Sequence, residues 1–195
     1  MLPITAVIIS SAAVLNKSWH GLEAVVQHLP FYKEPKDLHT ARLEALLKVK
    51  TTHFFYLDDD DDLPPDYLSV LEDCLSTDKP ISYTNEKIIT PQGNVEVSTP
   101  GAFSSEAYWK NPMLLHHLVL CNTKEALKVA ETLPRGEYWT EFLLYWPLTQ
   151  LAGAHYVPRI GYIWQRRLSG LSKRPRTVVS QMASRLHHRP TAPTF

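Results

Sequence analysis

The feature that most constrains this chain is a run of five consecutive aspartates, Asp58 to Asp62, placed directly after an apolar segment. The segment before the run, His53–Leu57, has the length and the aromatic content of a buried strand. Residues 64–75 begin with two prolines and then carry leucines at helical spacing, which favours a helix. This order predicts an α/β domain in which the carboxylates follow the carboxyl end of a strand.

Five adjacent carboxylates repel one another, so we expect a compensating cation, and a divalent metal is the simplest one. Oxygen ligands suit Mg2+ and Mn2+, which often bind through one or two carboxylates together with substrate phosphates. Ligand crevices of open α/β sheets lie at the carboxyl ends of strands, where this run is expected. The alternative is a solvated acidic loop, which the flanking strand and the two prolines disfavour.

Two other interpretations of the run use phosphate or calcium chemistry. An EF-hand loop that begins at Asp58 would need glycine and glutamate where Leu63 and Ser69 stand, so this interpretation fails. An aspartate-dependent phosphohydrolase also has an aspartate nucleophile after an apolar strand, although usually on the first strand. The phosphohydrolase stays open as an alternative.

The remaining pattern alternates strands and helices. A single domain is expected, because 195 residues with 44% hydrophobic content support one core. We assign residues 1–173 to this domain and residues 174–195 to a basic tail. The predicted strands are Ile4–Ile9, Ile81–Thr84, Lys87–Thr90, Val95–Ser98 and His155–Trp164, and the predicted helices are 19–29, Thr40–Lys50, 123–133 with Thr123 as N-cap, and 138–152.

Cysteine use and hydropathy indicate a cytoplasmic location. Cys74 and Cys121 fit no metal-binding or redox spacing, which favours a reducing compartment. The apolar start of the chain has no basic segment before it and is far shorter than the roughly 20 residues that span a bilayer. We therefore expect neither secretion nor a membrane span.

Charge is strongly segregated along the chain. Residues 1–141 contain all 20 acids and 12 Lys or Arg, for a net charge of −8, whereas residues 142–195 contain no acid and 8 Lys or Arg. Such a cationic segment favours phosphate-bearing partners: a nucleotide, nucleic acid or anionic lipid. Alternatively, the segment folds back onto the acidic part of the chain.

Residues 56–68, with their strand, aspartates, proline and leucine-bearing helix, resemble the large family two of glycosyltransferases. Ala41-Arg42 upstream, and Thr140-Glu141 and Tyr162 to Arg167 downstream, are similar to further elements of that family. The resemblance covers most of residues 4–173. It implies a single GT-A, Rossmann-like domain with a mixed, mainly parallel central sheet flanked by helices.

The resemblance also implies roles for individual residues. Asp58 and Asp60 would form the metal-binding pair, with Asp59 and Asp61 as the alternative register or as further donor contacts. Glu141 would be the general base that deprotonates the acceptor, or simply an acid favoured in the first turn of a helix. The expected contacts to the nucleotide sugar are Ser10, Ser11, Arg42, Asp59, Asp61, Arg166 and Arg167.

The chain departs from the family pattern at three places. Residues 22–38 show no second strand ending in paired aspartates. Glu141 is followed by phenylalanine instead of aspartate, and Leu168 and Ser169 stand where a metal-binding histidine is often found. The aromatic residues Tyr138, Trp139 and Trp146 are candidates for stacking on a ligand or for the core, and His116-His117 alone is a weak metal site.

The predicted function is a metal-dependent hexosyltransferase that uses Mn2+ or Mg2+ and a nucleotide-sugar donor of the UDP-sugar type. The hydroxyl acceptor is open: DNA with a hydroxymethylated base, of the kind that viral transferases glycosylate, or a lipid-linked or protein acceptor. The rival functions are the phosphohydrolase and a non-catalytic nucleic-acid-binding module that uses the basic tail.

Overall fold

A computed structural model of the chain describes residues 1–10, 19–29, 35–116, 118–133 and 140–167. Within these ranges, seven strands form one sheet in the order β2-β1-β3-β6-β4-β5, with β7 beside β4. Five strands run in one direction, whereas β5 and β6 run in the other. The strands are β1 Ile4–Ser10, β2 Glu23–His28, β3 His53–Asp58, β4 Ile81–Ile89, β5 Val95–Ser98, β6 Val119–Asn122 and β7 His155–Gln165.

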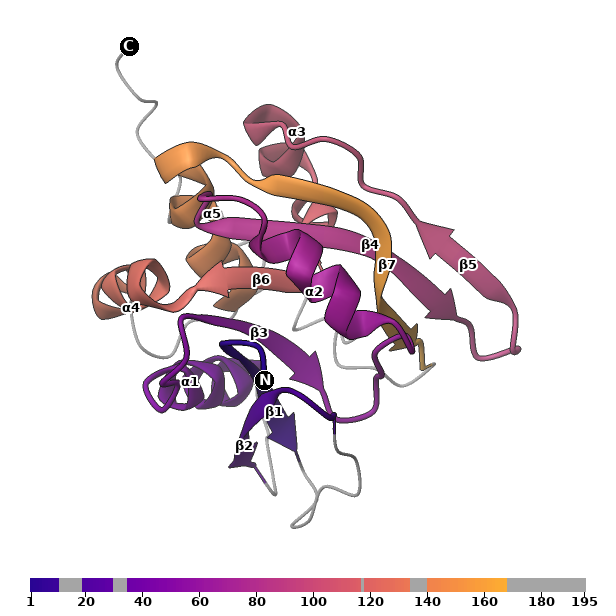
Figure 1. Ribbon diagram of the computed structural model, residues 1–195, viewed down its shortest axis with the longest axis horizontal. Helices are drawn as coiled ribbons and strands as arrows, with labels where there is room; N and C mark the ends of the chain where they lie inside the picture. The colour runs from indigo at the N-terminus through magenta and orange to yellow at the C-terminus, as the bar shows by residue number, and fades with distance from the viewer. Residues whose placement is uncertain (11–18, 30–34, 117, 134–139, 168–195) are drawn as a thin grey trace.

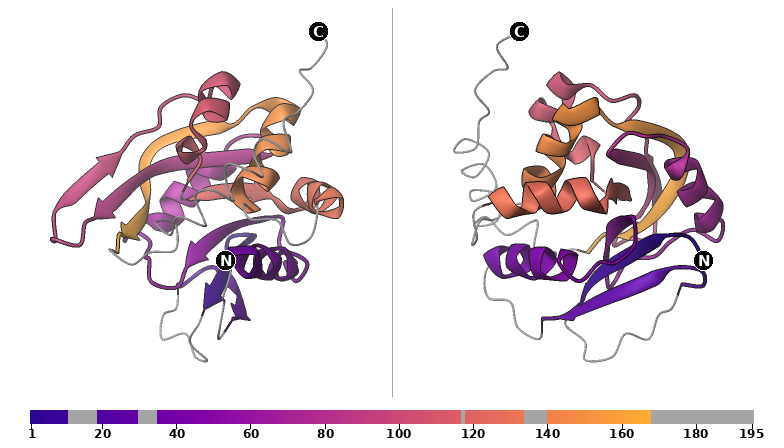
Figure 2. Two further views of the ribbon diagram at one scale, coloured as in Figure 1. Left: turned by 180° about the vertical axis from the view of Figure 1, so that it is seen from behind. Right: turned by 60° about the vertical axis from the view of Figure 1, so that its left-hand side comes forward.

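Helices cover both faces of the sheet (Figures 1 and 2). One face carries α2, and the other carries α1, α3, α4 and α5. The predicted α/β domain with a mixed, mainly parallel sheet is confirmed. The helices are α1 Pro35–Leu46, α2 Tyr67–Leu75, α3 Ser105–Lys110, α4 Thr123–Thr132 and α5 Thr140–Ala152, with a short 3-10 turn, η1, at Pro112–Leu114.

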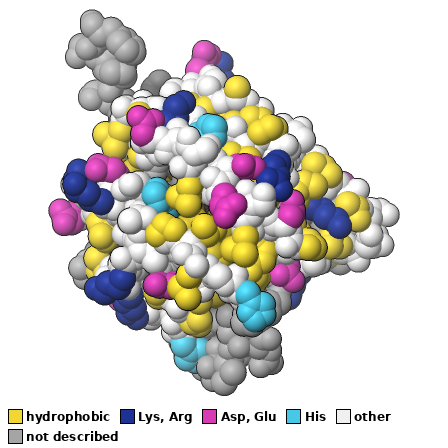
Figure 3. Space-filling view, viewed as in Figure 1, with side chains coloured by type: hydrophobic (Ala, Val, Ile, Leu, Met, Phe, Trp, Pro, Cys, Tyr) yellow, Lys and Arg dark blue, Asp and Glu magenta, His cyan; other side chains and the backbone are white. Residues whose placement is uncertain are grey.

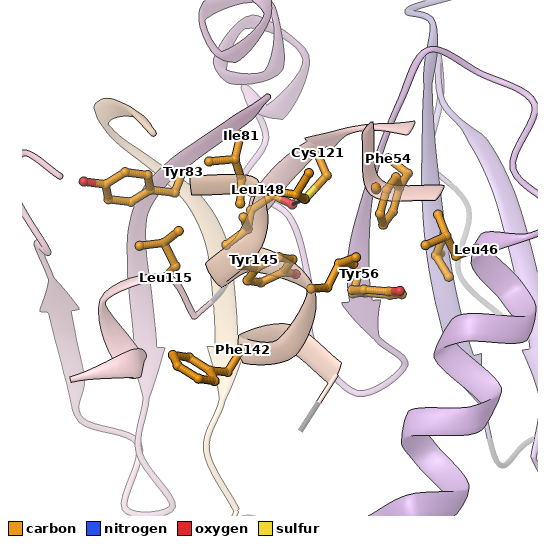
Figure 4. Packing of buried hydrophobic residues seen from close by; sticks show 14 of the residues in the cluster. Leu46, Phe54, Tyr56, Ile81, Tyr83, Leu115, Cys121, Phe142, Tyr145 and Leu148 are labelled. Carbon is orange, nitrogen blue, oxygen red and sulfur yellow. Dashed lines mark hydrogen bonds between the residues drawn. The ribbon is translucent and has the colours of Figure 1, made fainter. Parts of the chain in front are cut away.

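Aromatic side chains fill the core between the sheet and α5. Figure 4 shows Tyr145 and Leu148 of α5 near Tyr56 of β3, with Phe54 between the sheet and α1. The aromatic cluster extends to Trp146, which packs against the Trp109 ring at a centroid distance of 5.0 Å. Trp146 therefore belongs to this aromatic packing, while Tyr138 and Trp139 lie outside the described residues.

On the opposite face, the apolar side of α2 belongs to a core cluster with buried residues of β1, β3 and β7. Arg159 of β7 fastens this helix from outside, with one guanidinium nitrogen 2.6 Å from Asp66 and another 2.6 Å from Asp73. The position of α2 is therefore fixed on the strand that also ends beside the aspartate run.

The predicted helix over residues 19–29 is wrong, because Glu23–His28 forms strand β2. This strand pairs in parallel with β1 from Thr5 to Ser10. Its exposed and half-buried side chains alternate, and the two adjacent valines favour a strand. The three- and four-residue spacing of the apolar residues is thus coincidental. A second strand is therefore present within residues 22–38, although, as predicted, it does not end in paired aspartates.

Smaller corrections concern element boundaries. The two short strands predicted over 81–90 form one strand, β4. The residue that caps α4 is Asn122, whose side chain accepts a hydrogen bond from the Glu125 amide, and not Thr123. The strands β1, β3, β5 and β7 and the helices α4 and α5 agree with prediction, and α5 is followed by Gly153 at a φ of 71°.

The structure bears in part on the predictions about the cysteines and about membrane spans. Cys74 and Cys121 are both free and buried. Among the described residues, no helix is both long enough and apolar enough to cross a bilayer. The basic tail, residues 174–195, lies outside the described residues.

Candidate functional site

The carboxyl ends of β1 and β3 bring the first serine of the predicted site to the aspartate run. These strands are parallel neighbours, and Ile9 pairs with Asp58. The next residue, Ser10, donates a hydrogen bond from its hydroxyl to Asp59 Oδ2 at 2.8 Å. Ser11 lies outside the described residues.

Arg42 joins the aspartate run to the predicted base. Its side chain is buried, and one guanidinium nitrogen lies 2.9 Å from Asp58 Oδ1. The other terminal nitrogen forms an ion pair with Glu141, at the start of α5. The guanidinium also lies over the Tyr56 ring, 5.3 Å from its centroid. Residues from α1, β3 and α5 therefore meet at one arginine.

Asp61 differs from its neighbours because it is directed into the protein. It is 1% exposed, and its carboxylate accepts hydrogen bonds from the Tyr162 hydroxyl at 2.9 Å and the Gln165 amide at 2.7 Å. Burial and the Asp58 charge raise the pKa of Asp61 to about 7, although both hydrogen bonds oppose this rise. Asp61 thus anchors the run to β7.

Tyr162 also fixes the start of the run, since its hydroxyl accepts a hydrogen bond from the Asp58 amide at 3.1 Å. At the other end, the backbones of Asp62 and Ile163 form a two-way bridge. The Asp62 side chain accepts from the Leu63 amide at 2.9 Å. The run is therefore a loop tied to β7 at both ends, with Asp58, Asp59 and Asp60 half-buried between the ties.

The two predicted arginines at the end of β7 have different environments. Arg167 lies 2.9 Å from Asp60, and its charge opposes the effect of burial, which raises the Asp60 pKa. Arg166 lies over the Trp164 ring at 5.6 Å from the centroid. The structure therefore brings Arg167 to the aspartates and places Arg166 against an aromatic side chain.

Two arginines neutralise part of the negative charge for which the sequence predicted a metal ion. Arg42 and Arg167 each contact one aspartate. Carboxylate oxygens nevertheless suit a hard cation, and Asp58, Asp59 and Asp60 are half-buried at a strand end. In the ranges that the structure covers, no three possible ligand side chains are grouped around one point. A metal that binds here would therefore need substrate or water oxygens as further ligands.

Comparison with known proteins gives a fold and no close relative. No family model matches the sequence, and no curated protein matches it. The structure is similar to that of S. aureus TarS 1–349 in complex with UDP-GlcNAc, with a TM-score of 0.56 and 11% identity over 87% of this chain and 60% of that one. A longer S. aureus TarS structure gives a TM-score of 0.55 and 12% identity over 85% of this chain and 37% of that one.

At this identity, the likeness concerns the fold alone. The chain has a GT-A glycosyltransferase-like fold, as the sequence resemblance to family two of glycosyltransferases predicts. It spans 60% of the shorter TarS chain and 37% of the longer one, so less than two thirds of either.

Proposed function

We propose that this protein is a metal-dependent glycosyltransferase that moves a sugar from a nucleotide diphosphate to a hydroxyl acceptor. The observation that carries the proposal is the meeting of Ser10, Arg42, Glu141 and three half-buried aspartates at the carboxyl ends of adjacent strands. Open α/β sheets bind ligands at this edge. The fold shared with TarS, whose structure contains UDP-GlcNAc, supports a nucleotide-sugar donor of the UDP type.

The donor would lie against the ends of β1 and β3. The half-buried Asp59 would contact the ribose and base. The buried Ser10 holds Asp59 by its hydrogen bond, and the buried Arg42 supplies a cation beside Asp58. Arg167 pairs with Asp60 and can exchange this partner for a diphosphate oxygen, because arginine binds both groups with the same planar donors. Asp61 contributes by holding the loop in place rather than by binding the donor.

Asp58 and Asp60 are the proposed ligands of Mn2+ or Mg2+. Their side chains are half-buried and lie on either side of Asp59, whereas the Asp61 carboxylate is directed to Tyr162 and Gln165. This difference favours the register with Asp58 and Asp60. When bound, the metal would neutralise charge on the departing nucleoside diphosphate.

Glu141 is the proposed general base. The acceptor oxygen would attack the anomeric carbon of the donor, its proton would pass to the Glu141 carboxylate, and the bond to the diphosphate oxygen would break. The ion pair with Arg42 orients the carboxylate in the site. Positioned bases of this kind contribute roughly 10^2- to 10^4-fold to the rate.

A panel of nucleotide sugars, incubated with the protein and Mn2+ or Mg2+, tests the proposal. Release of nucleoside diphosphate that depends on the sugar supports the transferase. Release of inorganic phosphate alone would instead support the phosphohydrolase, and no release would favour a binding module. The hexosyl preference, the acceptor and the cytoplasmic location remain predictions.

Calorimetry with UDP tests the metal ligands separately. We expect Asp60→Ala to lose metal-dependent UDP binding while it keeps its fold, because one of two protein ligands is removed. Asp78→Ala is the matched control, since Asp78 is exposed on the loop after α2. Full metal-dependent binding by both Asp60→Ala and Asp58→Ala would contradict the assignment.

A further inference from the structure

Strand β4 buries a series of polar side chains where a core strand would carry apolar ones. Ser82 donates to the Cys74 carbonyl at 2.8 Å, and Asn85 accepts from the Tyr156 hydroxyl at 2.5 Å. The next residue, Glu86, is 7% exposed. An ionisable group is costly to bury unless it is paired, so the partner of Glu86 indicates what this position is for.

The partner of Glu86 is His116, in the segment between η1 and β6. The imidazole Nδ1 lies 3.3 Å from Glu86 Oε2, and the imidazole ring meets the Trp164 ring edge-on at a centroid distance of 5.0 Å. Counted over side-chain atoms alone, His116 is 22% exposed and Glu86 is 9% exposed. The pair therefore extends from the interior of the sheet to the surface.

The backbone around the pair is irregular on both neighbouring segments. The register between β4 and β7 shifts immediately before Glu86, at Thr84/Asn85 and at Asn85/Glu86. Bulges of this kind redirect side chains and are frequent beside active sites. Two residues after His116, the buried Leu118 has a φ of 29°, a left-handed conformation that is unfavourable for leucine. Such strain is concentrated at functional sites.

The pair lies next to the proposed transferase site. Glu86 is paired across the sheet with Tyr162, whose hydroxyl contacts Asp61 and the Asp58 amide. Trp164, which supports the imidazole, directly precedes Gln165, whose amide binds Asp61. The pair is therefore one strand away from the residues that hold the aspartate loop.

We propose that Glu86 and His116, supported by Trp164, form the acceptor side of the site and bind hydroxyl groups of a neutral saccharide; this rests on the proposed transferase function. A buried carboxylate accepts hydrogen bonds from hydroxyl groups and repels phosphates and other anions. The imidazole adds a second hydrogen-bonding group, and indole and imidazole rings pack well against the C–H faces of a sugar ring. The two residues thus determine which acceptor is used.

NMR of the histidine ring signals in the 195-residue protein tests the proposal without requiring activity. The probes are methyl β-glucoside and methyl β-N-acetylglucosaminide, added with UDP and Mg2+, and the His116 signals are assigned with His116→Gln. We expect at least one glycoside to shift the His116 signals. Glu86→Gln should weaken glycoside binding about tenfold, as expected for loss of a hydrogen bond to a charged group, while UDP affinity stays unchanged.

Glu106→Gln is the matched control, because Glu106 is an exposed residue that pairs with Lys110 on α3. The acceptor proposal is overturned if neither glycoside shifts the His116 signals, or if Glu86→Gln binds the glycosides as the unaltered protein does. It is also overturned if a duplex with 5-hydroxymethylcytosine shifts these signals and the glycosides do not. Glycoside binding without any UDP binding would instead contradict the donor half of the proposed function.

Discussion

Arg42 contacts both acidic parts of the proposed site and is itself buried. It pairs with Asp58 on one side and Glu141 on the other. Removing one partner from a buried charge group usually costs more stability than the group contributes as a whole. Substitutions of Arg42, Asp58 or Glu141 should therefore preserve the shape and the hydrogen-bonding capacity of the side chain. Effects on catalysis can then be separated from effects on folding.

Glu141→Gln meets that condition, and we predict a large loss of turnover with little loss of donor affinity. Glutamine can keep an oxygen toward Arg42 but cannot accept a proton. The transfer rate at saturating donor should fall by about 10^2- to 10^4-fold, and UDP affinity by calorimetry should stay near its original value. Glu125→Gln on α4 is a suitable control. An unaltered rate would assign the base to another group, with Glu137 next to be tested.

The raised pKa of Asp61, about 7, predicts a pH-dependent stability. Between pH 4 and pH 7, the folded state keeps a proton that the unfolded state has released. The free energy of unfolding should therefore fall as pH rises across this window, by up to about 1.4 kcal/mol per unit. Asp61→Asn should flatten the slope in urea titrations with EDTA, whereas Asp78→Asn should not. Equal slopes in all three proteins would contradict the prediction.

The sequence predicted several residues of the proposed site, but it did not predict the hydrogen bonds that hold the aspartate loop in place. The resemblance to family-two glycosyltransferases implied that Ser10, Arg42 and Glu141 lie near the aspartates, and the structure brings them together. The anchoring roles of Tyr162 and Gln165 were not predicted, because these residues are about a hundred positions away from Asp61. Local patterns carry no information about such a pairing.

At the scale of elements, β2 shows why local periodicity is insufficient at a sheet edge. Its side chains are half-buried at most, so they produce no clear apolar alternation. Its conformation is determined by hydrogen bonds to β1, which lies buried next to it. β1 and β3 were predicted because burial on both faces makes them continuous apolar runs. The register shifts beside Glu86 likewise could not be predicted locally, because they depend on how β4 pairs with β7.

Gly161 of β7 permits the close contact that holds these elements, and we predict that Gly161→Ala destabilises the fold. An added Cβ would lie 2.5 Å from Thr84 Oγ1 and 2.7 Å from Leu118 Cδ2. Overpacking of this kind costs roughly 1–3 kcal/mol, measurable as a shift of the urea midpoint. In a Thr84→Ala background the loss should be smaller, because two of the three closest atoms are removed. Strictly additive losses would contradict the mechanism.

At the scale of the whole molecule, the segregation of charge along the sequence is not visible on the face shown in Figure 3. Acidic and basic side chains are interspersed on the face in Figure 3. Most of the cations that lack a nearby acid in sequence, from Lys173 to Arg189, lie outside the described residues. These cations are candidates for binding phosphate groups outside the saccharide contacts proposed for Glu86.

We predict that the segment from Arg166 to Arg189 binds phosphates, and that its distal part serves the acceptor more than the donor. Each duplex phosphate that it neutralises should contribute about −0.9 to the slope of log affinity against log salt. Fluorescence anisotropy with duplex DNA at several salt concentrations measures this slope. Truncation after Lys173 should weaken binding and flatten the slope while donor hydrolysis stays nearly unchanged, because the truncated protein keeps residues 58–62 and Arg167. If neither protein binds DNA at low salt, a saccharide, lipid-linked or protein acceptor remains.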